Sequence, residues 1–322
     1  MVKVGIIGGA GYTAGELLRL LINHPEVSIE FVHSSSNAGR PVAEIHRDLV
    51  GETDLTFSDT HPLDAIDILF LCSAHGASRA FWAENPRPAA LRVIDLAQDY
   101  RDESDGYVYG LPEVNRERIA AATSVANPGC FATALQLSLL PLAAAGLLPQ
   151  SGDINITALT GSTGAGVKPS ATTHFSWRSG NISIYKPFTH QHLTEIGATL
   201  RSLQPGCDAK LNFVPMRGDF ARGIFAVTHL DCPLSEEEAA ALYADYYKDA
   251  PFTIVSATPI DLKQVVNTNK AIVHTEKHGN KLLITCAIDN LLKGASGQAV
   301  QNMNIMLGID QRTGLRLKPS AF

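Results

Sequence analysis

Residues 2–22 read VKVGIIGGAGYTAGELLRLLI, and this stretch decides the fold of the first part of the chain. Its apolar, β-branched start is typical of a buried strand, and residues 15–22 are typical of a helix. The turn between them fits G-x-x-G-x-x-A from Gly8 and G-x-G-x-x-A from Gly9. Such a turn lets the backbone approach a pyrophosphate at a helix N-terminus. The motif therefore predicts a dinucleotide-binding site, and the alternative is a tight turn that binds nothing. The predicted binding residues are Gly8, Gly9, Ala10, Gly11, Tyr12, Thr13 and Ala14.

The alternation of strand and helix continues outward from this stretch. Short apolar runs typical of strands recur at residues 27–33, 66–72 and 92–96. Strands that are apolar throughout and alternate with helices indicate a parallel sheet covered on both faces. The chain up to Cys130 is therefore expected to form a Rossmann-like, doubly wound α/β domain.

A different pattern follows Cys130. Longer, partly alternating runs, separated by loops rich in Gly and Ser, read as strands at residues 153–160, 211–216, 223–230 and 281–288. One acidic helix begins after Ser235, with Glu238 placed for a capping box, and ASGQAVQNMNIMLGI reads as a last helix. This part is expected to be an α+β domain with a mostly antiparallel sheet and helices on one face.

The end of the second expected strand has no acidic residue. NAD-specific folds usually place Asp or Glu there, to bind the ribose hydroxyls. This chain has HSSSNAGR at residues 33–40, which offers three hydroxyls and a guanidinium instead. That combination suits a 2′-phosphate and predicts NADP(H) as the cofactor, with a polar surface loop as the alternative. The binding residues would be Ser34, Ser35, Ser36 and Arg40.

Residues 124–133, SVANPGCFAT, place one thiol behind a rigid turn, at the start of a long apolar run. A helix N-terminus favours a thiolate through its dipole and its free N–H groups. Asn127 and Pro128 would fix the turn, and Gly129 would let a substrate approach the sulfur. Cys130 is therefore the predicted nucleophile. The alternative is a small residue that merely fills a helix start.

A thiolate beside a nicotinamide suggests that an activated acyl group becomes a thioester, which hydride then reduces to an aldehyde. Such a site needs an acid or base near the sulfur, and the chain offers His190 and His192, followed by Glu195. Alternating histidines could also bind a metal ion, but no third strong ligand is evident nearby. Acid–base or orienting roles are therefore expected and no metal is predicted. Structural or surface histidines are the alternative.

The composition limits the kinds of molecule that the protein is expected to bind. The 322 residues carry a net charge of −6 and no run rich in Lys or Arg, which argues against nucleic acid or an anionic membrane. The five cysteines are scattered without a C-x-x-C pair, so neither a disulfide framework nor a zinc site is expected. No signal peptide and no membrane span are expected, and a cytoplasmic location fits.

Several motifs occur in an order that resembles one enzyme family. They are VGIIGGAGYTAGELLRLL, SSSNAGRP, DLAQDYR, NPGCFATA, GSTGAG, KPFTHQH-x-x-EI and DNLLKGASGQAVQNMN. They cover essentially the whole chain, which resembles the N-acetyl-γ-glutamyl-phosphate reductases of arginine biosynthesis. The resemblance implies NADPH-dependent reduction of N-acetyl-γ-glutamyl phosphate, through a cysteine thioacyl intermediate, to N-acetylglutamate 5-semialdehyde and phosphate. The aspartate-semialdehyde dehydrogenases are related and share the cysteine chemistry.

The resemblance also implies residue roles. Cys130 matches the family's nucleophile, and the HQH segment matches its H-x-H pair, in which we favour His192 as acid–base and His190 as its support. Arg101 would clamp phosphate or carboxylate, unless it forms a surface ion pair. Lys293 and Gly294 would contact the cofactor, unless they simply precede a helix. The other substrate positions are Asn127, Ser162, Gly164 and either Arg217 or Arg222, because PMRGDFARG contains two candidates for the family's arginine.

The implied domains are residues 1–130 with 293–322, which would bind NADP(H), and residues 131–292, which would serve catalysis and dimerisation. A homodimer or homotetramer acting on a small acyl phosphate is expected. Three alternatives stay open. They are an aspartate-semialdehyde dehydrogenase, an N-succinyl variant of the same reaction, and a non-catalytic module that senses NADP(H).

Overall fold

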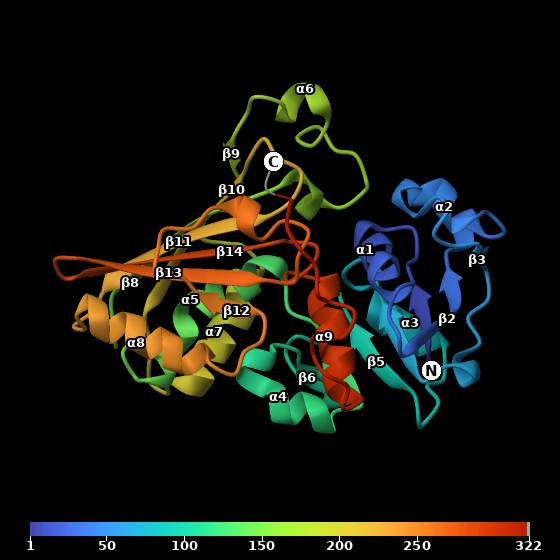
Figure 1. Cartoon of the computed structure of the whole chain (residues 1–322), viewed down its shortest axis with the longest axis horizontal. Helices are drawn as coiled ribbons and strands as arrows, with labels where there is room; N and C mark the ends of the chain where they lie inside the picture. The colour runs from blue at the N-terminus through green and yellow to red at the C-terminus, as the bar shows by residue number, and fades with distance from the viewer. Residues whose placement is uncertain (321–322) are drawn as a thin grey trace. The chain divides into compact units, whose positions relative to one another are not determined.

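The computed structural model describes residues 1–320, which divide into two compact units. Unit 1 comprises Met1–Pro128 and Ala295–Arg316, and unit 2 comprises Gly129–Gly294 with the described residues 317–320. Each unit is built on one seven-stranded sheet (Figure 1). The chain leaves unit 1 at the turn before Cys130 and returns to it at the last helix, α9 (Ser296–Met306).

The sheet of unit 1 is parallel in every pairing, in the order β3-β2-β1-β4-β5-β7-β6. Its strands are β1 (Val2–Ile7), β2 (Val27–His33), β3 (Phe57–Ser58), β4 (Ile68–Leu71), β5 (Arg92–Asp95), β6 (Val108–Tyr109) and β7 (Ser124–Ala126). Besides α9, its helices are α1 (Tyr12–Leu21), α2 (Val42–Ile45), α3 (Ala77–Glu84) and α4 (Pro112–Ala121). The strand order reverses between β1 and β4, where doubly wound folds bind ligands at the carboxyl ends of their strands. The expected Rossmann-like architecture is confirmed.

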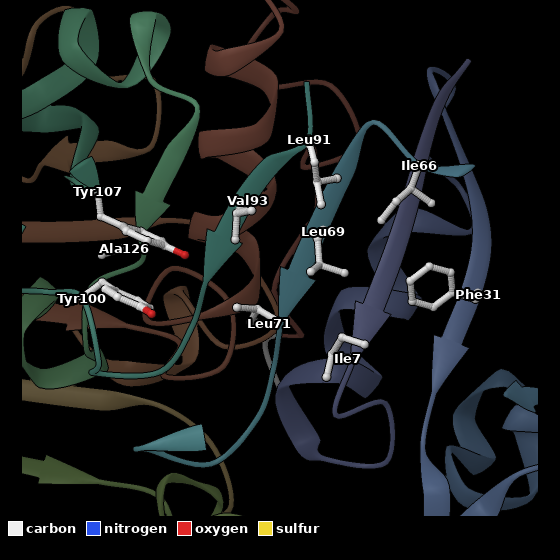
Figure 2. Packing of buried hydrophobic residues seen from close by; sticks show 10 residues of the cluster. All are labelled: Ile7, Phe31, Ile66, Leu69, Leu71, Leu91, Val93, Tyr100, Tyr107 and Ala126. Carbon is white, nitrogen blue, oxygen red and sulfur yellow. The ribbon is translucent and has the colours of Figure 1, made fainter. Parts of the chain in front are cut away.

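Both faces of this sheet are buried. On one face, apolar side chains of β1, β2, β4 and β5 form a cluster that includes Leu69 and Val93 (Figure 2). Trp82 of α3 packs against this cluster, and the stacked rings of Tyr100 and Tyr107, with centroids 4.1 Å apart, belong to it. Alternate residues of the same strands point the other way and are fully buried too. This burial explains why the strands are apolar throughout.

The sheet of unit 2 has the order β12-β13-β14-β11-β8-β10-β9, and four of its six pairings are antiparallel. Its strands are β8 (Asp153–Thr160), β9 (Ser183–Ile184), β10 (Lys210–Arg217), β11 (Ile224–Asp231), β12 (Thr253–Val255), β13 (Ala271–His278) and β14 (Lys281–Ile288). The expected α+β class is confirmed, but the strand prediction was incomplete. It missed β13 because His274, Glu276 and Lys277 interrupt its apolar residues.

Three helices of unit 2 lie on one side of its sheet: α5 (Cys130–Ala144), α7 (His192–Leu203) and α8 (Glu236–Tyr247) (Figure 1). The predicted capping box of Ser235 and Glu238 is present at α8. Helix α5 is buried on all sides, although Pro141 lies inside it and cannot donate to the carbonyl of Leu137. The hydroxyl of Tyr247 donates to that carbonyl at 2.6 Å and satisfies it.

One edge of the unit 2 sheet gathers several loops. β8 and β10 run parallel and end there, β11 begins there, and β14 ends opposite the start of β11. The loops after Thr160, Arg217 and Ile288 therefore meet at this edge. They include three of the six predicted substrate residues, Ser162, Gly164 and Arg222, and Arg217 ends β10 at the same edge.

Candidate active site

The glycine-rich loop lies at the carboxyl end of β1, where α1 begins. Gly8 has a φ of +79°, and a Cβ there would lie 2.8 Å from the backbone of Cys72, so the fold itself requires this glycine. Gly11 differs, because a Cβ on it would approach only the carbonyl oxygen of Gly8, at 3.7 Å. The missing side chain of Gly11 leaves room at the start of α1, which has no side-chain cap. This open helix start fits a dinucleotide pyrophosphate.

The predicted 2′-phosphate residues follow β2 (Val27–His33), at the same sheet edge as the glycine-rich loop, because β1 and β2 are parallel neighbours. Ser34 is buried, and its hydroxyl accepts a hydrogen bond from Asn37 at 3.1 Å, while the next two serines are exposed. Arg40 donates to Asn37 Oδ1 at 3.0 Å and forms an exposed ion pair with Glu44 at 3.1 Å. This loop presents hydroxyls and a cation, and no carboxylate follows β2 directly.

Arg101 and Asn127 brace the turn at which the chain leaves unit 1. Arg101 donates from Nε to the carbonyl of Asn127 at 2.9 Å and from Nη2 to the carbonyl of Leu96 at 3.1 Å. The buried amide of Asn127 donates to the carbonyl of Ala295 at 2.9 Å and accepts from Asn302 at 3.1 Å. These contacts fix the backbone before the thiol. Substrate binding by Arg101 and Asn127 stays a prediction.

Cys130 is the first residue of α5, and Gly129 caps this helix in an extended conformation. The backbone N–H of Gly129 donates to Oε2 of Glu195 at 3.2 Å. Gly294 packs directly beside the thiol, since a Cβ on Gly294 would lie 2.8 Å from the Cβ of Cys130. The thiol is thus partly exposed at a helix start, between a buried carboxylate and a close backbone.

The two predicted histidines lie together beside Phe131, the residue after the thiol. Their ring centroids are 4.6 Å apart, and the centroid of Phe131 is 5.4 Å from that of His190 and 6.3 Å from that of His192. Burial, with the cations Lys186 and Arg217 nearby, lowers the pKa of His190 to about 4. His190 is therefore uncharged near neutral pH.

His192 begins α7, and this position brings it near a carboxylate. Glu195 lies one turn further along the helix, with its Oε1 3.9 Å from Nε2 of His192, and both side chains are buried. The same carboxylate accepts the N–H of Gly129. Glu195 thus connects the histidine to the helix start that carries Cys130.

Tyr185 and Arg217 complete the group around the thiol. The guanidinium of Arg217 lies 4.6 Å from the ring centroid of Tyr185, whose ring is 5.8 Å from that of His190. Burial raises the pKa of Tyr185, and its electrostatic interaction with the nearby Cys130 adds to this rise. Tyr185 was not predicted, and only its position five residues before His190 could have suggested it.

Arg222, the other candidate arginine, has a different environment. It forms a two-point ion pair with Asp289, at 3.0 and 3.1 Å, and Asp289 is fully buried. Asn290 accepts from the N–H of Gly223 at 2.6 Å and donates to the hydroxyl of Thr163 at 3.0 Å. Arg222 therefore ties the loops of the sheet edge together, whereas Arg217 lies beside the histidines.

The remaining predicted residues lie close to these loops. Ser162 is half-buried and Gly164 exposed in the loop after β8, where the N–H of Ser162 donates to the carbonyl of Phe220 at 2.9 Å. Lys293 is fully buried in unit 2, directly before Gly294. Contact between Lys293 or Gly294 and the cofactor stays a prediction.

Two further properties concern the part of the chain that the structure describes. Within residues 1–320, no group of three His, Cys, Asp or Glu side chains is arranged to hold a metal ion. None of the helices described there has the length and apolar character needed to cross a membrane.

Comparison with known proteins places the chain in a family. Residues 3–122 match the family model described as semialdehyde dehydrogenase, NAD binding domain, and residues 130–290 match the one described as semialdehyde dehydrogenase, dimerisation domain. The N-acetyl-gamma-glutamyl-phosphate reductase of Phocaeicola vulgatus is 58% identical over the full length of both chains. The protein of the same name from Bacteroides thetaiotaomicron is 57% identical, again over both full lengths.

Solved structures agree on the fold. Aspartate semialdehyde dehydrogenase II of Vibrio cholerae, complexed with ASA, superimposes with a TM-score of 0.73 over 96% of this chain and 98% of that one, at 18% identity. Aspartate semialdehyde dehydrogenase of Candida albicans, solved with NADP, gives a TM-score of 0.72 over 95% and 99%, at 15% identity. At these identities the likeness concerns the fold alone.

Proposed function

Because the chain belongs to the N-acetyl-γ-glutamyl-phosphate reductase family, we propose that it reduces N-acetyl-γ-glutamyl phosphate to N-acetylglutamate 5-semialdehyde and phosphate in arginine biosynthesis, with NADPH. The observation that carries this proposal is the group around Cys130. A thiol lies at a helix start, with His192, Glu195 and an arginine within the same unit. An acyl phosphate requires a nucleophile, a proton carrier and a cation, and this group offers all three.

The first half-reaction forms a thioester on Cys130. His192 accepts the proton of the thiol, and the resulting thiolate attacks the acyl carbon of the substrate. The bond between this carbon and the phosphate oxygen breaks, and phosphate leaves with the bonding electrons. We favour Arg217 to bind the oxyanions, because Arg222 is engaged with Asp289.

In the second half-reaction, the cofactor chemistry required is a hydride for the carbonyl carbon of the thioester, which bound NADPH would supply. The protein then acts on a thiohemiacetal attached to Cys130. His192 is placed for the proton transfers as the C–S bond breaks and the aldehyde leaves, and the start of α5 stabilises the thiolate that returns. His190 is uncharged near neutral pH, so we assign it to the support of His192.

The cofactor would be held in unit 1. The open start of α1 at Gly11 suits the pyrophosphate, and Ser35, Ser36 and Arg40 suit a 2′-phosphate. We assign NADP(H) binding to unit 1 and catalysis to unit 2. We further propose a homodimer or homotetramer formed through residues 131–292, which the match to a dimerisation domain supports. We also propose that the protein is located in the cytoplasm.

The reverse reaction tests the function. N-acetylglutamate 5-semialdehyde, NADP⁺ and phosphate are mixed with the protein, and NADPH is followed by its absorbance. We expect phosphate-dependent formation of NADPH, and its loss in Cys130→Ser. N-succinylglutamate and aspartate semialdehydes, tested side by side, separate the two rival substrates. Activity with none of the three would leave the non-catalytic NADP(H)-sensing module.

A further inference from the structure

A cavity of about 250 Å³ lies in unit 2, at the start of the two parallel strands β8 and β10. Ile154 of β8 and Leu211 of β10 line it, and these two residues are paired in register. The loops near the candidate active site follow the opposite ends of both strands. Arg217 ends β10, six residues after Leu211, which corresponds to about 20 Å along a strand. Within residues 1–320, no member of the group around Cys130 lines this cavity, so it is a separate site.

One face of helix α7 forms another wall of the cavity. Leu193, Gly197, Leu200 and Arg201 line it, and steps of three or four residues place side chains on one side of a helix. Most of the lining is apolar. Among the described residues, Arg201 is the one charged side chain that lines the cavity, and no carboxylate does so. The cavity therefore suits a ligand that is largely apolar and carries a negative charge.

Gly197 makes room in the cavity at a cost to its helix. A glycine inside a helix is less stable than an alanine at the same position. The fold does not require this glycine, because its φ is not positive. Outside the backbone of the helix, the three atoms nearest to a Cβ placed there all belong to the flexible guanidinium of Arg201, with Nη1 at 3.0 Å. The missing side chain thus leaves space that only Arg201 borders closely.

The guanidinium of Arg201 is available to a ligand. Long side chains of helices point back toward the N-terminus, and this direction brings the guanidinium of Arg201 beside Gly197, one turn earlier. Arg201 is exposed, so the cavity can be reached from solvent. In the part of the chain that the structure describes, no group accepts a hydrogen bond from this guanidinium or pairs with its charge. A guanidinium of this kind can bind a carboxylate through two parallel hydrogen bonds.

We propose that this cavity binds a small apolar molecule with one carboxylate, which pairs with Arg201 while the apolar part fills the space beside α7. An apolar cavity of about 150 Å³ holds benzene, so the larger space here accommodates one ring or a short branched chain together with a carboxylate. Cys207 also lines the cavity, and its thiol donates to the carbonyl of Pro149 at 3.5 Å. A bound ligand would cover this thiol. The proposal does not depend on the function proposed above.

The test uses phenylacetate as the probe and its uncharged amide, 2-phenylacetamide, as the matched control ligand. Isothermal titration calorimetry should give a dissociation constant of about 1 mM or below for phenylacetate, as is reasonable for a ligand of this size. The amide should bind at least about tenfold more weakly, because it lacks the charge. Arg201→Gln should weaken the binding of phenylacetate at least about tenfold for the same reason. Arg116→Gln removes the same charge from an exposed position on α4 and should leave the binding unchanged.

Two further measurements locate the probe in the cavity. At about ten times its dissociation constant, phenylacetate should slow the alkylation of Cys207 by iodoacetamide about tenfold, because only about a tenth of the cavities stay empty. Peptide mapping by mass spectrometry measures this rate. Gly197→Leu should abolish binding, because its side chain would fill the cavity. Gly197→Ala should weaken binding without loss of the fold, because alanine favours the helix.

Several results would overturn the proposal. If Arg201→Gln bound phenylacetate as tightly as the wild type, the guanidinium would not be the anchor. Equal affinities for phenylacetate and its amide would show that the site does not recognise a carboxylate. Binding without protection of Cys207 would place the probe elsewhere on the protein. The absence of saturable binding to the wild type would remove the site altogether.

Discussion

Helices α1 and α5 begin alike and are used differently. Each follows a strand and a short turn, and each has a glycine at its cap. Gly11 has φ −82° and ψ 163°, and Gly129 has φ −71° and ψ 151°, and neither helix has a side-chain cap. Both helix starts therefore present N–H groups that make no hydrogen bond within the helix, and the positive end of a dipole.

The difference lies in what surrounds each helix start. Around Gly11 the protein leaves space, and an anion from solution can approach. At Gly129, the N–H group is taken by Glu195, while Gly294 packs against the thiol that the helix presents. A helix start that is capped by glycine can thus either bind a cofactor or activate a nucleophile. Long-range neighbours, rather than the local motif, decide between the two.

The largest expected effect concerns the thiol. Burial raises the pKa of Cys72 to about 12, whereas Cys130 is partly exposed at a helix start. Near neutral pH we expect iodoacetamide to alkylate Cys130 more than about 10³-fold faster than Cys72. Peptide mapping by mass spectrometry after timed quenching measures both rates. Equal rates would remove the idea that α5 activates its first residue.

The two histidines should differ in their effect on turnover. His192→Gln should lower kcat by about 10²–10³-fold, because a proton carrier is lost from a site that keeps its nucleophile. His190→Gln should cost about tenfold or less, because an uncharged supporting ring is replaced. Stopped-flow and steady-state rates over a pH series give both values. If His190→Gln had the larger effect, the two roles would have to be exchanged.

His190 should also affect stability. Its pKa is lowered from 6.5 to about 4, so the unfolded chain binds its proton more readily than the folded one. Its stabilising contribution is therefore fully present above the unfolded pKa and is lost as the pH falls toward the folded pKa. His190→Phe should reduce the acid-induced loss in free energy of unfolding by roughly 3 kcal/mol. Urea titrations over this pH range measure the free energy of unfolding, and His229→Phe, at an exposed histidine, is the control. If the free energy of unfolding fell with pH equally in both variants, the prediction would be contradicted.

The smallest expected effect compares two glycines. Gly11→Ala should raise the KM for NADPH about tenfold, because the new methyl group would weaken cofactor binding by about 1.4 kcal/mol. The melting temperature should stay unchanged. Gly294→Ala should instead lower kcat and slow the alkylation of Cys130, because the methyl group would press on the thiol residue. If Gly294→Ala raised only the KM for NADPH, position 294 would belong to the cofactor site.

The fold of unit 1 was predictable because its determinants are local. The apolar runs at residues 2–8, 27–33, 66–72 and 92–96, which alternate with helices, suffice to indicate a parallel sheet. In unit 2 the alternation of apolar and polar residues is weaker, and β13 was missed because its polar residues interrupt the apolar pattern. The capping box at Ser235 was predictable because it needs only four residues in sequence.

For the candidate site, the sequence alone could indicate only motifs that are continuous in sequence. Cys130 and the HQH pair are such motifs, and the structure brings them together. The choice between Arg217 and Arg222 could not be made, because Asp289, the partner of Arg222, lies 67 residues away in sequence. Tyr185 was missed for the same reason, since its N–H donates to the carbonyl of Pro215 next to the pairing of β9 with β10, which places its ring beside Arg217 and His190.

The central claim is that Cys130 carries the acyl group. The enzyme is mixed with N-acetyl-γ-glutamyl phosphate in the absence of NADPH, and the reaction is quenched with acid. The protein is then digested, and the masses of its peptides are measured by mass spectrometry. We predict an N-acetylglutamyl adduct on the peptide that contains Cys130, which disappears when NADPH is added before the quench. An adduct on another residue, or none while reduction proceeds with NADPH, would contradict the account.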